Sequence, residues 1–205
     1  MPVALRPDSG WADRGSGRRD RTAKGDGFMT TEATRRVALV FSLFDANANG
    51  VLEADDFELM ADRVVREAHA SDQAAKDAMR GAFRRYWTTL LTELDENGDG
   101  EISFEEFTAC VLSPERFDAT IAVFAEALAA LGDPDGDGLI ERPLFMALMT
   151  AIGFEPANID ALFDAFEPTD GDRIRVETWV AGIKDYYAPG KAGIPGDHLV
   201  VGTPV

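Results

Sequence analysis

The stretch DENGDGEISFEE, residues 95–106, decides the fold of this chain. Side chains that carry oxygen stand at its first, third, fifth and twelfth positions: Asp95, Asn97, Asp99 and Glu106. Gly100 stands at the sixth position, where it allows the backbone to turn sharply. A calcium ion accepts six to eight oxygen ligands, and twelve residues can wrap them around the ion only if the chain turns midway. The stretch therefore predicts a calcium-binding loop.

The remaining ligands of this second loop follow from the same spacing. We expect the backbone carbonyl of Glu101 to bind at position seven and Ser103, at position nine, to hold a water molecule. Glu106 would close the site with both carboxylate oxygens.

The spacing recurs elsewhere in the chain, so an internal repeat is present. With the turn position in register, four segments begin at Asp45, Asp95, Asp133 and Glu167. Position eight is apolar in every copy: Leu52, Ile102, Ile140 and Ile174. Paired loops exchange a short strand-like contact there, so the repeat predicts that the loops fold in pairs.

The first loop, residues 45–56, has a nearly complete set of ligands. They are Asp45, Asn47, Asn49, the carbonyl of Val51, and Asp56, with Glu53 at position nine. The closing aspartate is one methylene shorter than glutamate, so it must draw the loop inward to bind through both oxygens. Binding through one oxygen would give the six-coordinate geometry that suits magnesium. We expect calcium here, with magnesium as a competitor.

The third loop, residues 133–144, opens with three aspartates but has no closing carboxylate. Its expected ligands are Asp133, Asp135, Asp137 and the carbonyl of Leu139. Leu144 stands at position twelve and carries no side-chain oxygen, although Glu141 at position nine could fold onto the ion. We expect weakened binding here, and the sequence leaves open whether the loop is occupied at all.

The fourth loop, residues 167–178, departs from the pattern at almost every ligand position. Asp172 stands where the turn glycine belongs, and Thr178 replaces the closing glutamate. We expect this loop to bind no calcium and to act as a structural partner that pairs Ile174 with Ile140.

Apolar residues flank each loop at the spacing of an amphipathic helix. Examples are Val37, Val40, Phe41 and Phe44 before the first loop, Phe104, Phe107 and Val111 after the second, and Trp179, Ile183 and Tyr187 after the fourth. The pattern predicts an all-α fold in which four helix–loop–helix motifs form two packed pairs.

Four parts of the chain are expected. Residues 1–28, rich in Gly, Arg and Asp, form a disordered extension, and whether they act as a basic arm for an acidic partner stays open. Residues 29–112 hold the first pair of motifs and residues 113–188 the second. Residues 189–205 form a tail that packs back on the core.

The charge of the chain limits its partners. The net charge is −17, and because residues 1–28 hold six basic and four acidic side chains, the other 177 residues carry −19. Divalent cations would relieve this repulsion, so metal binding and folding should be coupled. The sign of the charge argues against nucleic-acid binding, and no stretch approaches the length of a membrane span.

The sequence argues against an enzyme. The chain has only His69 and His198 as histidines, a single Cys110, and no phosphate-binding or nucleophile motif. Cys110 has no disulfide partner within the chain and is expected to be a small core residue. No apolar run resembles a secretory signal, so we expect a soluble, monomeric cytoplasmic protein.

The chain resembles a four-hand EF-hand protein of the sarcoplasmic calcium-binding and bacterial calerythrin type. The resemblance rests on Asp56 followed by Phe57, on a long helical insert over residues 61–94, and on the tail over residues 189–202. It implies a compact all-α fold with packed halves and a calcium-buffering role. In the bacterial relatives the second hand is commonly degenerate and the fourth intact. This chain shows the reverse, so the occupancy of the family's sites cannot be transferred.

The open functional question is buffer or sensor. A sensor opens on binding calcium to expose an apolar, often methionine-rich groove, whereas buffer hands barely open. The chain has six methionines, and Met1 and Met29 lie outside the expected fold. Leu199, Val200 and Val201 of the tail could fill a groove. Both features favour a buffer, and a sensor with an unidentified target protein is the alternative.

Overall fold

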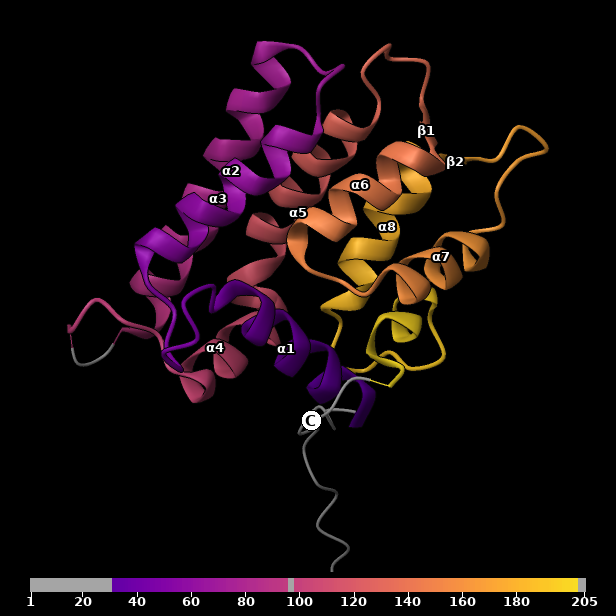
Figure 1. Ribbon diagram of the computed structural model, residues 1–205. Coiled ribbons are helices and arrows are strands. Elements are labelled where there is room, and N and C mark those ends of the chain that lie inside the picture. The colour runs from indigo at the N-terminus through magenta and orange to yellow at the C-terminus, as the bar shows by residue number, and fades with distance from the viewer. Residues whose placement is uncertain (1–30, 96–97, 203–205) are drawn as a thin grey trace, which may run out of the picture.

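The computed structural model describes residues 31–95 and 98–202, apart from the side chains of Cys110 and Pro114. Its elements are α1 (Thr31–Phe44), α2 (Ala54–Glu67), α3 (Gln73–Leu94), α4 (Phe104–Val111), α5 (Pro114–Gly132), β1 (Leu139–Glu141), α6 (Arg142–Ile152), α7 (Pro156–Ala165), β2 (Arg173–Arg175), α8 (Val176–Tyr186) and the 3₁₀ helix η1 (Pro195–Val200). Figure 1 shows a helical molecule in which each loop joins two helices. The predicted all-α fold is confirmed. The predictions for residues 1–28, Asn97 and the side chain of Cys110 lie outside the described part of the chain.

Two short strand-like contacts join the loops in pairs, as the repeat predicts. Leu52 and Ile102 exchange two backbone hydrogen bonds of 2.9 and 3.0 Å between the first and second loops. β1 and β2 run antiparallel and place Ile140 opposite Ile174 between the third and fourth. All four side chains are buried, so each contact also anchors its loops to the core.

The helical insert between the first two loops consists of two helices. α2 ends at Glu67, and α3 begins after Asp72, whose side chain accepts the N–H of Ala75 at 2.8 Å. An aspartate in this capping position satisfies a backbone donor that the first turn of a helix leaves unpaired. The break allows α2 and α3 to pack against each other.

The two halves of the chain share one hydrophobic core. α3 packs on α5 and α2 packs on α6, so both helix pairs join the halves. Tyr86 of α3 lies at the centre of this core, with ring contacts to Phe44 at 5.4 Å and to Phe117 at 4.7 Å. Each such buried ring contributes about 1.5–3 kcal/mol to folding. The expected core residue Phe104 is instead 41% exposed, with its ring 5.3 Å from that of Phe41.

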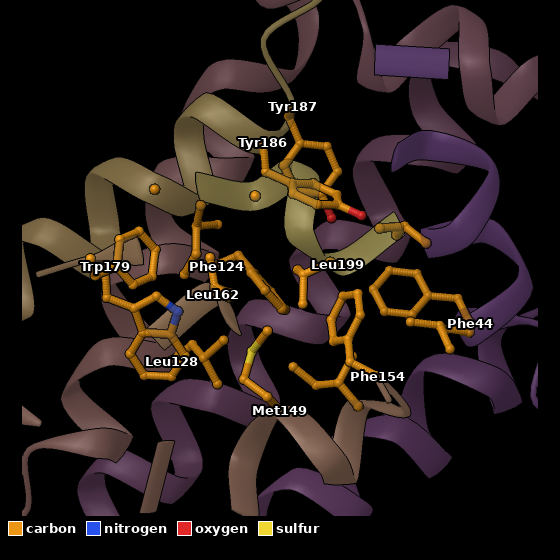
Figure 2. A pocket seen from close by; sticks show the side chains of 17 residues that line it. Phe44, Phe124, Leu128, Met149, Phe154, Leu162, Trp179, Tyr186, Tyr187 and Leu199 are labelled. Carbon is orange, nitrogen blue, oxygen red and sulfur yellow. The ribbon is translucent and has the colours of Figure 1, made fainter. Parts of the chain in front are cut away.

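The C-terminal segment lies back on the helices. η1 contacts α1, α7 and α8, and Asn158 of α7 donates hydrogen bonds to the carbonyls of Leu199 and Val201. Leu199 is 4% exposed, whereas Val201 is 64% exposed, so only the first of these two apolar side chains is inserted. Figure 2 shows Leu199 among the rings that surround an apolar cavity of about 60 Å³.

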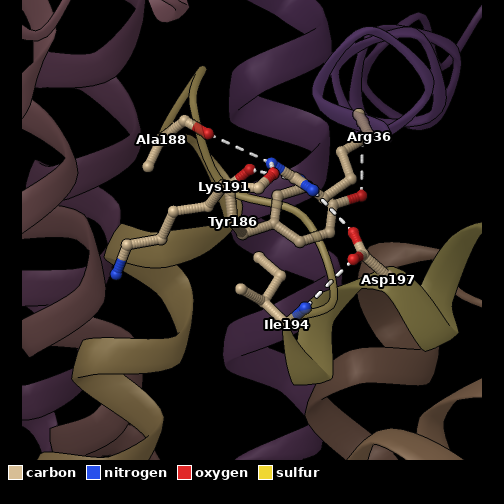
Figure 3. Close-up of polar contacts among 6 residues, drawn as sticks. All are labelled: Arg36, Tyr186, Ala188, Lys191, Ile194 and Asp197. Carbon is tan, nitrogen blue, oxygen red and sulfur yellow. Dashed lines mark hydrogen bonds and ion pairs between the residues drawn. The ribbon is translucent and has the colours of Figure 1, made fainter. Parts of the chain in front are cut away.

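A buried arginine fixes this segment to the first helix. Arg36 of α1 is fully buried and forms an ion pair with Asp197 at 2.6 Å. Its other N–H groups donate to the carbonyls of Tyr186, Ala188 and Lys191. Figure 3 shows this network, in which Asp197 also accepts the N–H of Ile194. Breaking a buried ion pair costs about 3–5 kcal/mol, so the network holds α1 and the end of the chain together.

Among the described helices, none is both long and apolar enough to span a bilayer.

Candidate metal centres

The first three loops share one arrangement around their first aspartate. One oxygen of Asp45, Asp95 and Asp133 accepts the N–H of position five, at 3.0, 3.1 and 3.1 Å. The other oxygen accepts the N–H of the turn glycine, at 2.9, 3.0 and 3.0 Å. Each loop is therefore curled around its first carboxylate.

The turn glycines make this curl possible. Gly50, Gly100 and Gly138 have φ values of 89°, 78° and 81°. Side chains with a Cβ rarely adopt this left-handed conformation, so the backbone of these three loops favours glycine at position six.

Position five is also fixed by the backbone in all three loops. The Oδ1 atoms of Asn49, Asp99 and Asp137 accept the N–H of position seven, at 3.0, 3.0 and 2.8 Å. The side-chain oxygens at positions one and five are thus held in place by hydrogen bonds along the loop. The donors offered are carboxylate and amide oxygens, which suit hard cations such as calcium and magnesium.

The first loop draws its polar side chains together. Glu53 at position nine accepts hydrogen bonds from the side-chain amides of Asn47 (3.3 Å) and Asn49 (2.9 Å). Asp56 is 2% exposed, and its two oxygens accept the N–H groups of Ala46 and Glu53, both at 3.0 Å. Asp56 therefore connects the start of the loop to the first turn of α2.

The second loop closes differently. Glu106 accepts two hydrogen bonds from Ser103, from its backbone N–H at 2.9 Å and from its hydroxyl at 2.8 Å. This is the arrangement of a capping box at the start of α4. Both of these hydrogen bonds go to Oε2 of Glu106. The expected ligand Asn97 lies outside the described residues.

The third loop brings three carboxylates together. One oxygen from each of Asp133, Asp135 and Asp137 lies within 4.8 Å of the others, a spacing that one cation could bridge. Leu144 at position twelve has no side-chain oxygen, so it cannot supply a ligand, and it is partly buried against the core. Glu141 at position nine is exposed.

The fourth loop has a different backbone conformation from the first three. Asp172, at the position of the turn glycine, has a φ of 57°, and its N–H bonds to the carbonyl of Thr169. The N–H of Thr169 in turn donates to the carbonyl of Arg173 at 2.8 Å. These bonds close a local turn in place of the curl around a first aspartate, which agrees with the predicted structural partner.

Two arginines form ion pairs between the third and fourth loops, and the sequence predicted neither. Arg142, in the first turn of α6, binds the carboxylates of Asp160 and Asp164 at 2.6 Å each and Asp172 at 2.9 Å. The hydrogen bonds that Arg142 donates, first to Asp172 and then to Asp164, raise the pKa of Arg142 above its ordinary value. In the opposite direction, Arg173 binds Asp137 of the third loop at 3.0 Å. Arg142 stands at position ten of the third loop and Arg173 at position seven of the fourth. These positions predict a contact only when the register of the two strands is known.

Comparison with known proteins agrees with this geometry. The family model "EF hand" matches residues 89–112, which include the whole second loop. Calerythrin of Saccharopolyspora erythraea is 24% identical over 168 residues, which cover 78% of this chain and 94% of that protein. The probable calcium-binding protein CML34 of Arabidopsis thaliana is 30% identical over 114 residues, or 56% of this chain and 69% of that protein.

Two solved structures have the same fold. A calcium-binding protein of Streptomyces coelicolor, described in terms of calcium-mediated regulation, is 26% identical with a TM-score of 0.63, over 77% of this chain and 98% of its own. The sarcoplasmic calcium-binding protein of amphioxus is 20% identical with a TM-score of 0.60, over 86% of this chain and all of its own. The chain belongs to the EF-hand calcium-binding proteins, among which it is similar to calerythrin and to the sarcoplasmic calcium-binding protein.

Proposed function

We propose that this protein is an intracellular calcium buffer that acts as a monomer and binds calcium through its first and second loops. The first loop would use Asp45, Asn47, Asn49, the carbonyl of Val51 and Asp56. The second would use Asp95, Asn97, Asp99, the carbonyl of Glu101 and Glu106. The third loop would bind more weakly, through Asp133, Asp135, Asp137 and the carbonyl of Leu139. The fourth serves the structure only.

One observation supports a buffer above a sensor: the C-terminal segment packs against α1, α7 and α8 and buries Leu199. Leu199 is inserted beside the cavity of Figure 2, and the ion pair between Arg36 and Asp197 holds the segment that carries it. A sensor must expose apolar surface to a target when calcium binds. Here such exposure would first require the release of the ion pair between Arg36 and Asp197 and of the hydrogen bonds that Arg36 donates to the carbonyls of Ala188 and Lys191.

The test is the binding of a hydrophobic dye to the metal-free and calcium-loaded protein. A buffer predicts that dye fluorescence stays unchanged when calcium is added. The deletion of residues 195–205 provides a positive control, because it removes Leu199 and Asp197 and should increase dye binding in both states.

A calcium sensor is the second candidate, and the Streptomyces coelicolor relative favours it because that protein is described in terms of calcium-mediated regulation. A rise in dye fluorescence on adding calcium to the full-length chain would select the sensor and reject the buffer.

Magnesium enters the proposal at the first loop. Asp56 closes that loop with a shorter side chain than Glu106, and it is already bonded to both ends of the loop. A six-coordinate ion that needs one oxygen from position twelve fits this arrangement. Millimolar magnesium should therefore weaken calcium binding at the first loop more than at the second, and equal affinities with and without magnesium would reject this part of the proposal.

A further inference from the structure

A positively charged side chain of the protein, that of Arg173, already contacts the third loop. Arg173 of β2 lies opposite Glu141 in the strand register, and its Nη1 donates to Oδ2 of Asp137 at 3.0 Å. The other oxygen of Asp137 accepts the N–H of Leu139. Both oxygens of this fifth-position ligand are thus engaged, one of them by a positive charge from the neighbouring loop.

Position seven of the partner loop carries no such charge in the first pair of loops. Arg173 stands at position seven of the loop paired with the third. In the first pair of loops, position seven is Val51 on one side and Glu101 on the other. Neither carries a positive charge, so the contact distinguishes the third loop from the first two.

We propose that Arg173 is a tethered cation that competes with calcium for Asp137 and sets the affinity of the third loop. The inference rests on the proposed calcium binding by that loop. The three carboxylates lie within 4.8 Å of one another and repel each other when no ion is present. The guanidinium of Arg173 relieves part of this repulsion, and calcium must displace it to gain the second oxygen of Asp137.

The missing closing residue makes the competition effective. Leu144 contributes no oxygen, so the three aspartates carry most of the binding, and losing one of them to Arg173 matters more than it would in a complete loop. The third loop would then fill only after the first two, and calcium binding there would release Arg173 from the third loop.

The variant R173Q tests the proposal, because it removes the charge and keeps a polar side chain. Calcium titration followed by NMR should show the third-loop affinity rising roughly 1.4-fold to fivefold, the range expected when a partly exposed ion pair is removed. The reporter is the amide of Gly138, which donates to Asp133. R173K keeps the charge and should bind nearly as the unmodified protein does.

R175Q is the matched control. Arg175 lies on the same strand, loses the same charge on substitution, and has its nearest acidic partner in Glu177 at 3.9 Å, outside the third loop. It should leave the third-loop affinity within the error of the measurement. If the calcium affinity of the third loop rises equally in R175Q and R173Q, the effect comes from net charge and the proposal is wrong. The proposal is also wrong if R173Q and the unmodified protein have equal third-loop affinities.

The amides of Gly50 and Gly100 separate this inference from the proposed function. If they respond to calcium while Gly138 responds in neither the unmodified protein nor R173Q, the third loop binds no calcium and the inference fails, but the buffer proposal for the first two loops stands. If none of the three amides responds, the proposed function fails as well.

Discussion

At the scale of single residues, Asp56 has two structural tasks besides the proposed ligand role. It accepts the N–H groups of Ala46 and Glu53 while almost fully buried. The variant D56A would leave both donors without this partner and should lower the metal-free stability by about 1–2 kcal/mol. Denaturant unfolding in a chelator measures the loss. D55A, in the same turn but exposed, should change stability by less than about 0.5 kcal/mol. Equal effects of the two variants would contradict the role of Asp56.

Leu144 is the residue that limits the third loop. L144E restores a carboxylate at position twelve and should raise calcium affinity there by roughly tenfold or more. The metal-free protein should lose about 1–2 kcal/mol, since Leu144 packs partly against the core. L144Q has the same shape without the charge and separates the two effects. Unchanged third-loop affinity in L144E, read from the Gly138 amide, would show that the loop cannot close around an ion.

The sequence could predict the residues that each loop places along its own backbone. The first aspartate, the fifth-position oxygen and the turn glycine occur at fixed spacing, and local hydrogen bonds hold them wherever the spacing is kept. Arg142 and Arg173 could not be predicted in the same way. Their partners in the adjoining loop, Asp172 and Asp137, lie 30 and 36 residues away, across a strand pair whose register sets which side chains meet.

At the scale of elements, the apolar period predicted which face of each helix is buried. It did not predict where helices end or which residues lie at the border of the core. The period shows which face is buried and cannot show that a cap at Asp72 divides residues 61–94 into two helices. Phe104 fits the apolar stripe of α4, yet it lies at the edge of the core and remains 41% exposed. The period also marked Tyr187, which lies just past the end of α8, whereas the more deeply buried side chain is its neighbour Tyr186.

The packing of η1 depends on a close approach at Gly196. A Cβ added there would lie 2.7 Å from Cδ2 of the Tyr186 ring, which is too short for a contact. G196A should therefore force η1 away from α8, lower the stability by about 1–3 kcal/mol, and increase dye binding without calcium. G190A, in the same tail, meets no atom within 4 Å and is the control. Equal melting temperatures for the two variants would contradict the close packing of η1.

At the scale of the whole molecule, buried tyrosines at the junction of α8 and the tail make the fold sensitive to alkali. Burial raises the pKa of Tyr187 to about 12, and burial likewise raises the pKa of Tyr186 well above its ordinary value of 10.0. The unfolded chain loses these protons near pH 10 while the folded chain keeps them. Their stabilising contribution is therefore complete below pH 10 and is lost as the pH rises toward 12.

The melting temperature of the protein should accordingly fall steeply between pH 10 and pH 12, and circular dichroism at fixed ionic strength can follow it. Y187F removes one of the two ionisable groups and should make the fall shallower. A melting temperature that falls equally in Y187F and in the unmodified protein would assign the alkaline loss to other groups.

The acidity of the molecule and its proposed function have one physical explanation. A net charge of −17 destabilises a compact chain, and bound cations would offset part of that repulsion. Calcium should therefore stabilise the fold in proportion to the number of loops that bind it, by about 2.7 kcal/mol for each site at a hundredfold excess over its dissociation constant.

Calorimetric titration of the metal-free protein with calcium, repeated in millimolar magnesium, tests the central claim most directly. Two equivalents of roughly micromolar or tighter affinity, with a third weaker one and with magnesium weakening the first loop, are the predicted result. The absence of any calcium uptake by the folded, metal-free chain would contradict the account.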